Sequence, residues 1–83
     1  MIARDKKALQ QAIAEEIMSK PGVLARVYIK RNYSATVPYE DICVWYAKAD
    51  GSESEKCIHL ATKTIYETPK DELAKRIAAH LQL

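Results

Sequence analysis

Glycine, proline and cysteine are all scarce in this chain of 83 residues, which contains two, three and two of them. The two glycines, Gly22 and Gly51, lie too far apart for a phosphate-binding loop, which needs its glycines within a few residues of one another. Two cysteines are too few for the disulfide framework of a small secreted domain. No cysteine or histidine stands at zinc-finger spacing from another. These absences exclude the common nucleotide-binding and zinc-binding signatures, so no cofactor or metal is expected.

Long apolar runs and a strong excess of one charge are also missing. No run approaches the ~20 apolar residues that cross a bilayer, and the charged residues 1–7 are not followed by the apolar core of a secretory signal. Thirteen basic against eleven acidic residues give a net charge of +2, which is too balanced for a nucleic-acid tail. The sequence therefore predicts a soluble, cytoplasmic protein with no membrane contact, whose Cys43 and Cys57 are reduced thiols.

The apolar share of 48%, with five tyrosines and one tryptophan, is enough for one core. A chain of this length buries roughly 60–65% of its unfolded surface. We therefore expect a single domain over residues 1–83.

Three adjacent acid pairs, including Glu40-Asp41, are interpreted as solvated, because neighbouring side chains diverge on helices and strands.

Two segments have the apolar spacing of amphipathic helices. Residues 3–19 place Leu9, Ile13 and Ile17 on one stripe, and Pro21 and Gly22 end the helix. The second helix begins near Thr68, a plausible N-cap, with Pro69 at its first position. Its stripe consists of Leu73, Ile77 and Leu81.

Three segments between these helices alternate apolar and polar residues, which is typical of half-buried strands. They cover residues 23–33, 41–48 and 56–64. Asp50-Gly51 separates the last two and predicts a hairpin turn. The order helix-strand-strand-strand-helix predicts an α+β two-layer sandwich, with a three-stranded antiparallel sheet and both helices on one face.

The hairpin register decides what Cys43 meets on the next strand. A three-residue loop 49–51 places Cys43 opposite Cys57, whereas a longer loop places it opposite His59. These pairings leave open a cross-strand disulfide or a thiol–histidine contact. A strand surface has no pocket that excludes water, so we expect no enzyme activity and no metal site here.

The sheet face opposite the helices is the candidate binding surface. Alternation places on it Arg26, Tyr28, Lys30, Cys43, Trp45, Cys57, His59 and Lys63. Exposed aromatic and arginine side chains are enriched at protein interfaces, whereas aromatics interleaved with bases also suit single-stranded nucleic acid. The favoured function is a small interaction protein, of the inhibitor or adaptor type, that binds a protein partner or itself. The alternative is a single-stranded RNA or DNA binding module that uses the same face. The expected binding residues are Arg26, Tyr28, Lys30 and Trp45, with His59 and Lys63 at the margin.

The order of elements resembles the topology of the double-stranded RNA-binding domain over nearly the whole chain. That family has a lysine cluster at the start of its second helix, where it contacts phosphates. The matching stretch here, residues 69–75, contains Asp71 and Glu72. These two acids would repel phosphate, so double-stranded RNA binding is not expected.

Overall fold

One antiparallel sheet and three helices make up the computed structural model, which describes residues 6–32 and 36–81. The elements are, in chain order, α1 (Lys6–Met18), β1 (Leu24–Asn32), β2 (Tyr39–Ala47), β3 (Glu53–Ala61), α2 (Thr62–Glu67) and α3 (Lys70–His80). The predicted α+β class and the three-stranded antiparallel sheet are confirmed. Residues 3–5 of the predicted first helix and Tyr33 of the predicted first strand lie outside the described residues.

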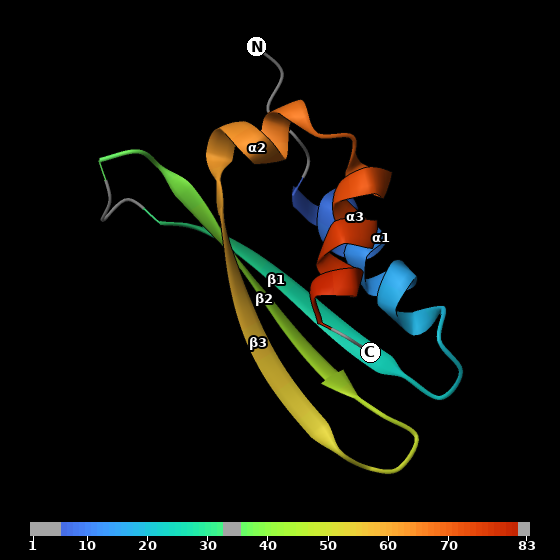
Figure 1. Cartoon of the computed structure of the whole chain (residues 1–83). Coiled ribbons are helices and arrows are strands. Elements are labelled where there is room, and N and C mark those ends of the chain that lie inside the picture. Colours follow the sequence, from blue (N-terminus) through green and yellow to red (C-terminus); the bar gives the residue numbers. More distant parts are fainter. Residues whose placement is uncertain (1–5, 33–35, 82–83) are drawn as a thin grey trace.

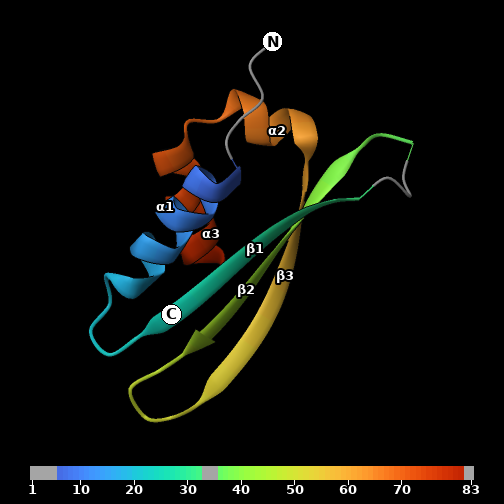
Figure 2. The ribbon, with the colours of Figure 1, turned by 180° about the vertical axis from the view of Figure 1, so that it is seen from behind.

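The sheet has the strand order β1-β2-β3, so β2 is the central strand. Helices α1 and α3 pack side by side over one face of the sheet, and α1 contacts β1 (Figure 1). Seen from behind, β3 runs along the side of the sheet away from these helices (Figure 2). The opposite face of the sheet carries no helix of the described chain. The predicted two-layer arrangement is therefore confirmed, with one open sheet face.

The core lies between the helices and the inner face of the sheet. The helical stripes predicted from the sequence are buried, and Ile42, Val44 and Tyr46 of β2 are at most 5% exposed. Val27, Ile58 and Leu60 are only partly buried and pack at the edge of the core. Ile58 and Leu60 lie on β3, where the helical layer does not fully cover the sheet.

Two predictions about the second half of the chain are wrong. The third strand ends at Ala61 rather than Thr64, and a short helix, α2, follows it directly. The N-cap position of α3 is occupied by Pro69 rather than Thr68, and no side chain caps that helix. Ile65 of α2 is 3% exposed, so burial of this side chain favours the helical turn over a longer strand.

The predicted hairpin between β2 and β3 closes with the shorter loop, residues 49–51. The Lys48 amide donates to the Ser52 carbonyl at 2.9 Å, and the Gly51 amide donates to the Lys48 carbonyl at 3.0 Å. Gly51 has a φ of 89°, a left-handed conformation that glycine adopts without steric cost. This turn fixes the register of the two strands and hence the residues that share a face.

The outer edge of β1 is contacted by a side chain of α1. The Ile29 amide donates to Gln10 Oε1 at 3.0 Å. Because Ile29 lies in the middle of β1, this bond occupies a donor that an edge strand would otherwise leave unpaired.

Within the part of the chain that the structure describes, no helix has both the length and the apolar character needed to cross a membrane.

Candidate interaction surface

The open face of the sheet is built from five rows of paired residues. Alternation along a strand places every second residue on the same face, and the pairing aligns these residues across the sheet. We define the open face by these rows: Leu24–Ala47–Glu53, Arg26–Trp45–Glu55, Tyr28–Cys43–Cys57, Lys30–Asp41–His59 and Asn32–Tyr39–Ala61. Five of the six predicted binding residues are among them.

Lys63 is the predicted binding residue that does not belong to the open face. It lies on α2, where its ammonium group is 3.9 Å from Glu67 Oε1. The prediction followed from extending the third strand to Thr64, and the chain instead turns into a helix at Thr62. Lys63 is therefore not part of this surface.

Trp45 lies at the centre of the second row. The guanidinium carbon of Arg26 is 5.5 Å from the centroid of the Trp45 ring, within the range of a cation–π contact. A shallow depression of about 280 Å³ adjoins this pair. Its lining is formed by Arg26, Val27, Tyr28, Cys43, Trp45 and Glu55. Trp45 is half-buried, as its position opposite the helices predicted.

The middle row contains a disulfide between Cys43 and Cys57. The two Cα atoms are 4.0 Å apart, because the shorter hairpin loop places the residues directly opposite each other. The expectation of two reduced thiols is therefore wrong for this structure. Tyr28 stands in the same row and is 61% exposed, so an aromatic ring and a disulfide lie together at the centre of the face.

His59 is held in the fourth row by two neighbours on β2. Its Nδ1 atom is hydrogen-bonded to Asp41 Oδ1, and its ring packs edge-on against Tyr39, with centroids 5.5 Å apart. Asn32 Nδ2 donates to the other oxygen of Asp41 at 3.2 Å. The hydrogen bond from His59, reinforced by that from Asn32, lowers the pKa of Asp41. Asp41 therefore stays ionised and positions the imidazole.

The charge of the open face differs from the predicted basic surface. Asp41, Glu53 and Glu55 share the face with Arg26 and Lys30. Asp41 stands two residues before Cys43, so strand alternation already pointed to it. Glu53 and Glu55 were missed because the third strand was predicted to begin at Lys56 rather than at Glu53. The basic side chains are thus on β1, and the two glutamates are on β3.

Exposed apolar area adds to the face at its β1 side. Leu24 is 62% exposed and shares the face with Tyr28. The predicted first strand includes Leu24. Because Leu24 stands two residues before Arg26, strand alternation assigns both residues to the open face. Leu24 and Tyr28 leave apolar surface on β1 in contact with water.

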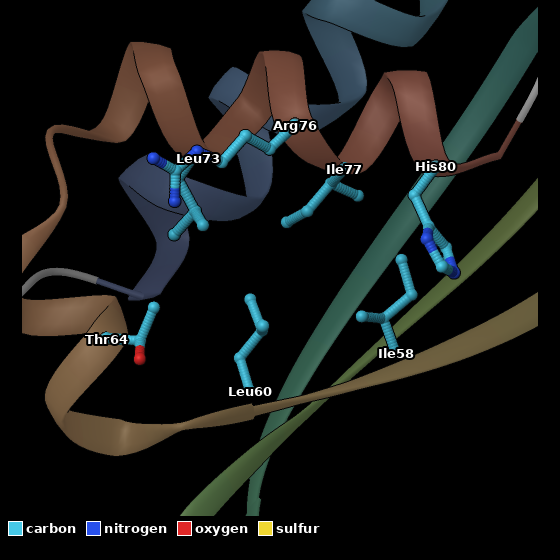
Figure 3. A pocket seen from close by; sticks show the side chains of 7 residues that line it. All are labelled: Ile58, Leu60, Thr64, Leu73, Arg76, Ile77 and His80. Carbon is cyan, nitrogen blue, oxygen red and sulfur yellow. The ribbon is translucent and has the colours of Figure 1, made fainter.

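A second concavity lies on the helix side of the sheet, between α3 and β3 (Figure 3). Ile58 and Leu60 of β3 face Leu73 and Ile77 of α3 across it. Thr64, Arg76 and His80 complete the lining of this groove, which measures about 170 Å³. It is the place where the helical layer does not close over the edge strand.

Chemistry at a metal or catalytic centre needs several ligating side chains in one place. Among residues 6–32 and 36–81, no cluster of three or more histidine, cysteine or acidic side chains suited to a metal ion is found. The polar groups of the open face are spread over its rows.

Comparisons with known proteins find no match to this chain among protein-family models, curated proteins or solved structures.

Proposed function

We propose that this chain is a small, non-enzymatic interaction protein, of the inhibitor or adaptor type, that binds a protein surface through its open face. The observation that carries the proposal is the depression beside Trp45, which has Arg26 on one side and Glu55 on the other. An apolar depression bordered by charges of both signs is typical of a protein contact, where a desolvated centre is surrounded by a polar rim.

Trp45 and Tyr28 are the residues that we expect to contribute most of the binding energy. Tryptophan, tyrosine and arginine dominate interface hot spots, and Arg26 lies against the Trp45 ring. Lys30 and His59 both lie two rows from Trp45, so we assign them to the margin of the contact, where charges act mainly on the association rate.

Charge favours a protein over the alternative ligand, single-stranded nucleic acid. A nucleic-acid surface needs lysine and arginine along the path of the phosphates. Arg26 and Lys30 meet this need on β1, but Asp41 lies beside Lys30, and Glu55 lies two strands from Arg26 in the same row. These acids would repel a phosphate backbone that crosses the sheet.

Replacement of Trp45 tests the proposal. Proteins that bind the wild-type chain are captured from cells with wild-type, Trp45→Ala and Lys63→Ala chains as baits, identified, and titrated against each purified bait. We expect Trp45→Ala to weaken binding by about 2 kcal/mol or more, while Lys63→Ala, outside the face, changes little. Circular dichroism of both variants checks that the fold is kept. Unchanged affinity in both Trp45→Ala and Tyr28→Ala would show that the open face is not the site.

Salt dependence separates the two ligand classes. Binding of a labelled single-stranded oligonucleotide would weaken steeply with salt, because phosphate contacts release counterions. We expect the protein contact to respond much less, since its centre is apolar. The single-stranded nucleic-acid alternative would be favoured if the oligonucleotide binds tightly, if this binding weakens steeply with salt, and if Trp45→Ala abolishes it.

A further inference from the structure

We propose that the protein surface bound by the open face is the open face of a second copy of this chain. The inference rests on the proposed function and names its partner. Its basis is the separation of charge across the sheet, with Arg26 on one outer strand and Glu55 on the other, in the same row.

A two-fold axis along β2 makes this pattern self-complementary. Such a rotation turns one sheet over onto the other, so that β1 of one copy lies over β3 of its partner. Positions along the strands are preserved, so each row of one copy faces the same row of the other. Arg26 then faces Glu55 of the partner subunit, and symmetry repeats this contact once more.

Neither charge in this pair is neutralised within its own copy. Arg26 and Glu55 form no ion pair with another described residue, and the two are separated by the whole width of β2. Both side chains are exposed, so they are available to a partner.

The other two-fold arrangement places like charges together. An axis across the strands would lay β1 over β1 of the second copy and β3 over β3. If this axis passes through the row of Tyr28, Arg26 faces Lys30 of the partner subunit. Like charges that face each other across an interface are unfavourable. The axis along β2 also brings one such pair together, Asp41 and Asp41 of the partner subunit, but Lys30 lies beside each of these acids. Because this axis also joins Arg26 to Glu55 twice, the charge pattern favours it over the axis across the strands.

The two aromatic residues at the centre of the face also match in this arrangement, whereas Leu24 faces Glu53 of the partner subunit. Trp45 lies on the axis strand and would pack on Trp45 of the partner subunit, because each row faces its own copy. Aromatic pairs of this kind stabilise a contact beyond their buried area. Tyr28 would cover Cys57 of the partner subunit, which places an aromatic ring on a disulfide sulfur.

The size of the face suits a reversible dimer. Strands of nine residues at about 3.3 Å per residue are roughly 30 Å long, and three of them span roughly 14 Å. Two flat faces of this size bury roughly 800–900 Å² in total, which is below the range of stable specific interfaces and within that of weak, transient contacts. We therefore expect self-association that depends on protein concentration.

A charge exchange between two variants tests the pairing directly. Sedimentation velocity of Arg26→Glu alone and of Glu55→Arg alone should show a dimer dissociation constant at least tenfold above that of the wild type. An equimolar mixture of the two should form a heterodimer, because both contacts then again join an acid and a base. Lys56→Glu is the matched control; it makes the same charge change as Arg26→Glu on the other face of β3, and should leave the dimer intact.

Two results would overturn the dimer. One is a wild-type chain that stays monomeric up to about millimolar concentration; the other is a mixture that stays monomeric like its two components. Trp45→Ala separates this failure from failure of the proposed function. A monomeric wild type removes the second copy but leaves the face open to another protein. A wild-type dimer that Trp45→Ala does not weaken shows that the two copies join elsewhere, so the dimer of open faces fails, and the titration of captured proteins against Trp45→Ala then decides the proposed function.

Discussion

At the scale of single residues, Asp41 and His59 form a hydrogen-bonded pair on the open face. The aspartate accepts hydrogen bonds from His59 and Asn32, and these bonds lower its pKa below the ordinary value of 3.8. An acid whose pKa is lower in the folded state stabilises the fold above its unfolded-state pKa. That contribution is lost as the pH falls through the lower, folded-state value.

Asp41→Asn should therefore have a pH-dependent effect on stability. We expect the variant to be less stable than the wild type at about pH 7, and the difference to shrink as the pH falls below about 4. Urea unfolding of both proteins across this range measures the difference, and titration of the other acids affects both alike. A difference that stays constant down to about pH 2 would show that ionisation of Asp41 does not stabilise the fold.

Glu40 joins three elements at one end of the sheet. Its carboxylate lies 3.3 Å from Lys6 Nζ of α1 and 3.2 Å from Arg31 Nε of β1, and it accepts a hydrogen bond from Thr62 Oγ1 of α2. The interpretation of Glu40 as a solvated acid is wrong, because it is 1% exposed. Strand alternation places it on the inner face of β2, beside the buried Ile42.

Glu40→Ala should destabilise the fold by about 2 kcal/mol or more, since hydrogen bonds to a charged group are lost inside the structure. Glu67→Ala is the matched control, because Glu67 pairs with Lys63 at 3.9 Å on the surface of α2. Exposed pairs of this kind contribute about 0.5 kcal/mol or less. Chemical denaturation of both variants measures the two losses, and equal losses would contradict a structural role for buried Glu40.

Local patterns were sufficient for the elements whose two faces differ strongly, and they were not sufficient where the chain changes from one element to another. The helical stripes and the strand alternation predicted α1, α3 and the inner face of the sheet. Thr62–Glu67 contains β-branched residues that favour a strand, yet it forms α2. The Thr62 amide donates to the Pro38 carbonyl at 3.1 Å. This contact with a residue far along the chain is invisible to a local pattern.

The same limit explains which residues of the candidate site could be predicted. Arg26, Tyr28 and Lys30 share a face because they alternate on one strand, and Trp45 and His59 follow from the alternation of theirs. Glu53 and Glu55 have no apolar neighbours that mark them as strand residues. Their place on the face depends on pairing with β2 beyond the turn, so the acidic side of the surface appears only in the folded chain.

A domain of this size buries little apolar surface on folding, and no described helix covers the open face of its sheet. The Cys43–Cys57 disulfide compensates in part, because it closes a loop across a sequence separation of 14 residues. A covalent link of this span restricts the unfolded chain and stabilises the fold relative to it.

Replacement of both cysteines by serine should lower the free energy of unfolding by about 2–4 kcal/mol. Denaturant titrations with and without a dithiol reductant measure this. We expect the reductant to destabilise the wild type to a similar degree and to leave the Cys43→Ser, Cys57→Ser variant unchanged. A wild type that unfolds at the same denaturant concentration in both conditions would show that the link adds no stability.

The hydrogen bond between Gln10 and the Ile29 amide limits how the sheet can grow by misassembly. Growth into a fibre requires that each added molecule offer a fresh, unblocked edge to the next one. Among the described strands, β3 has the edge that α1 does not contact, whereas strand addition at β1 would have to displace the bond from Gln10. When two molecules pair through their β3 edges, neither has a second free edge, and strand addition stops. Edge pairing between single copies of this chain should therefore end at edge-joined pairs.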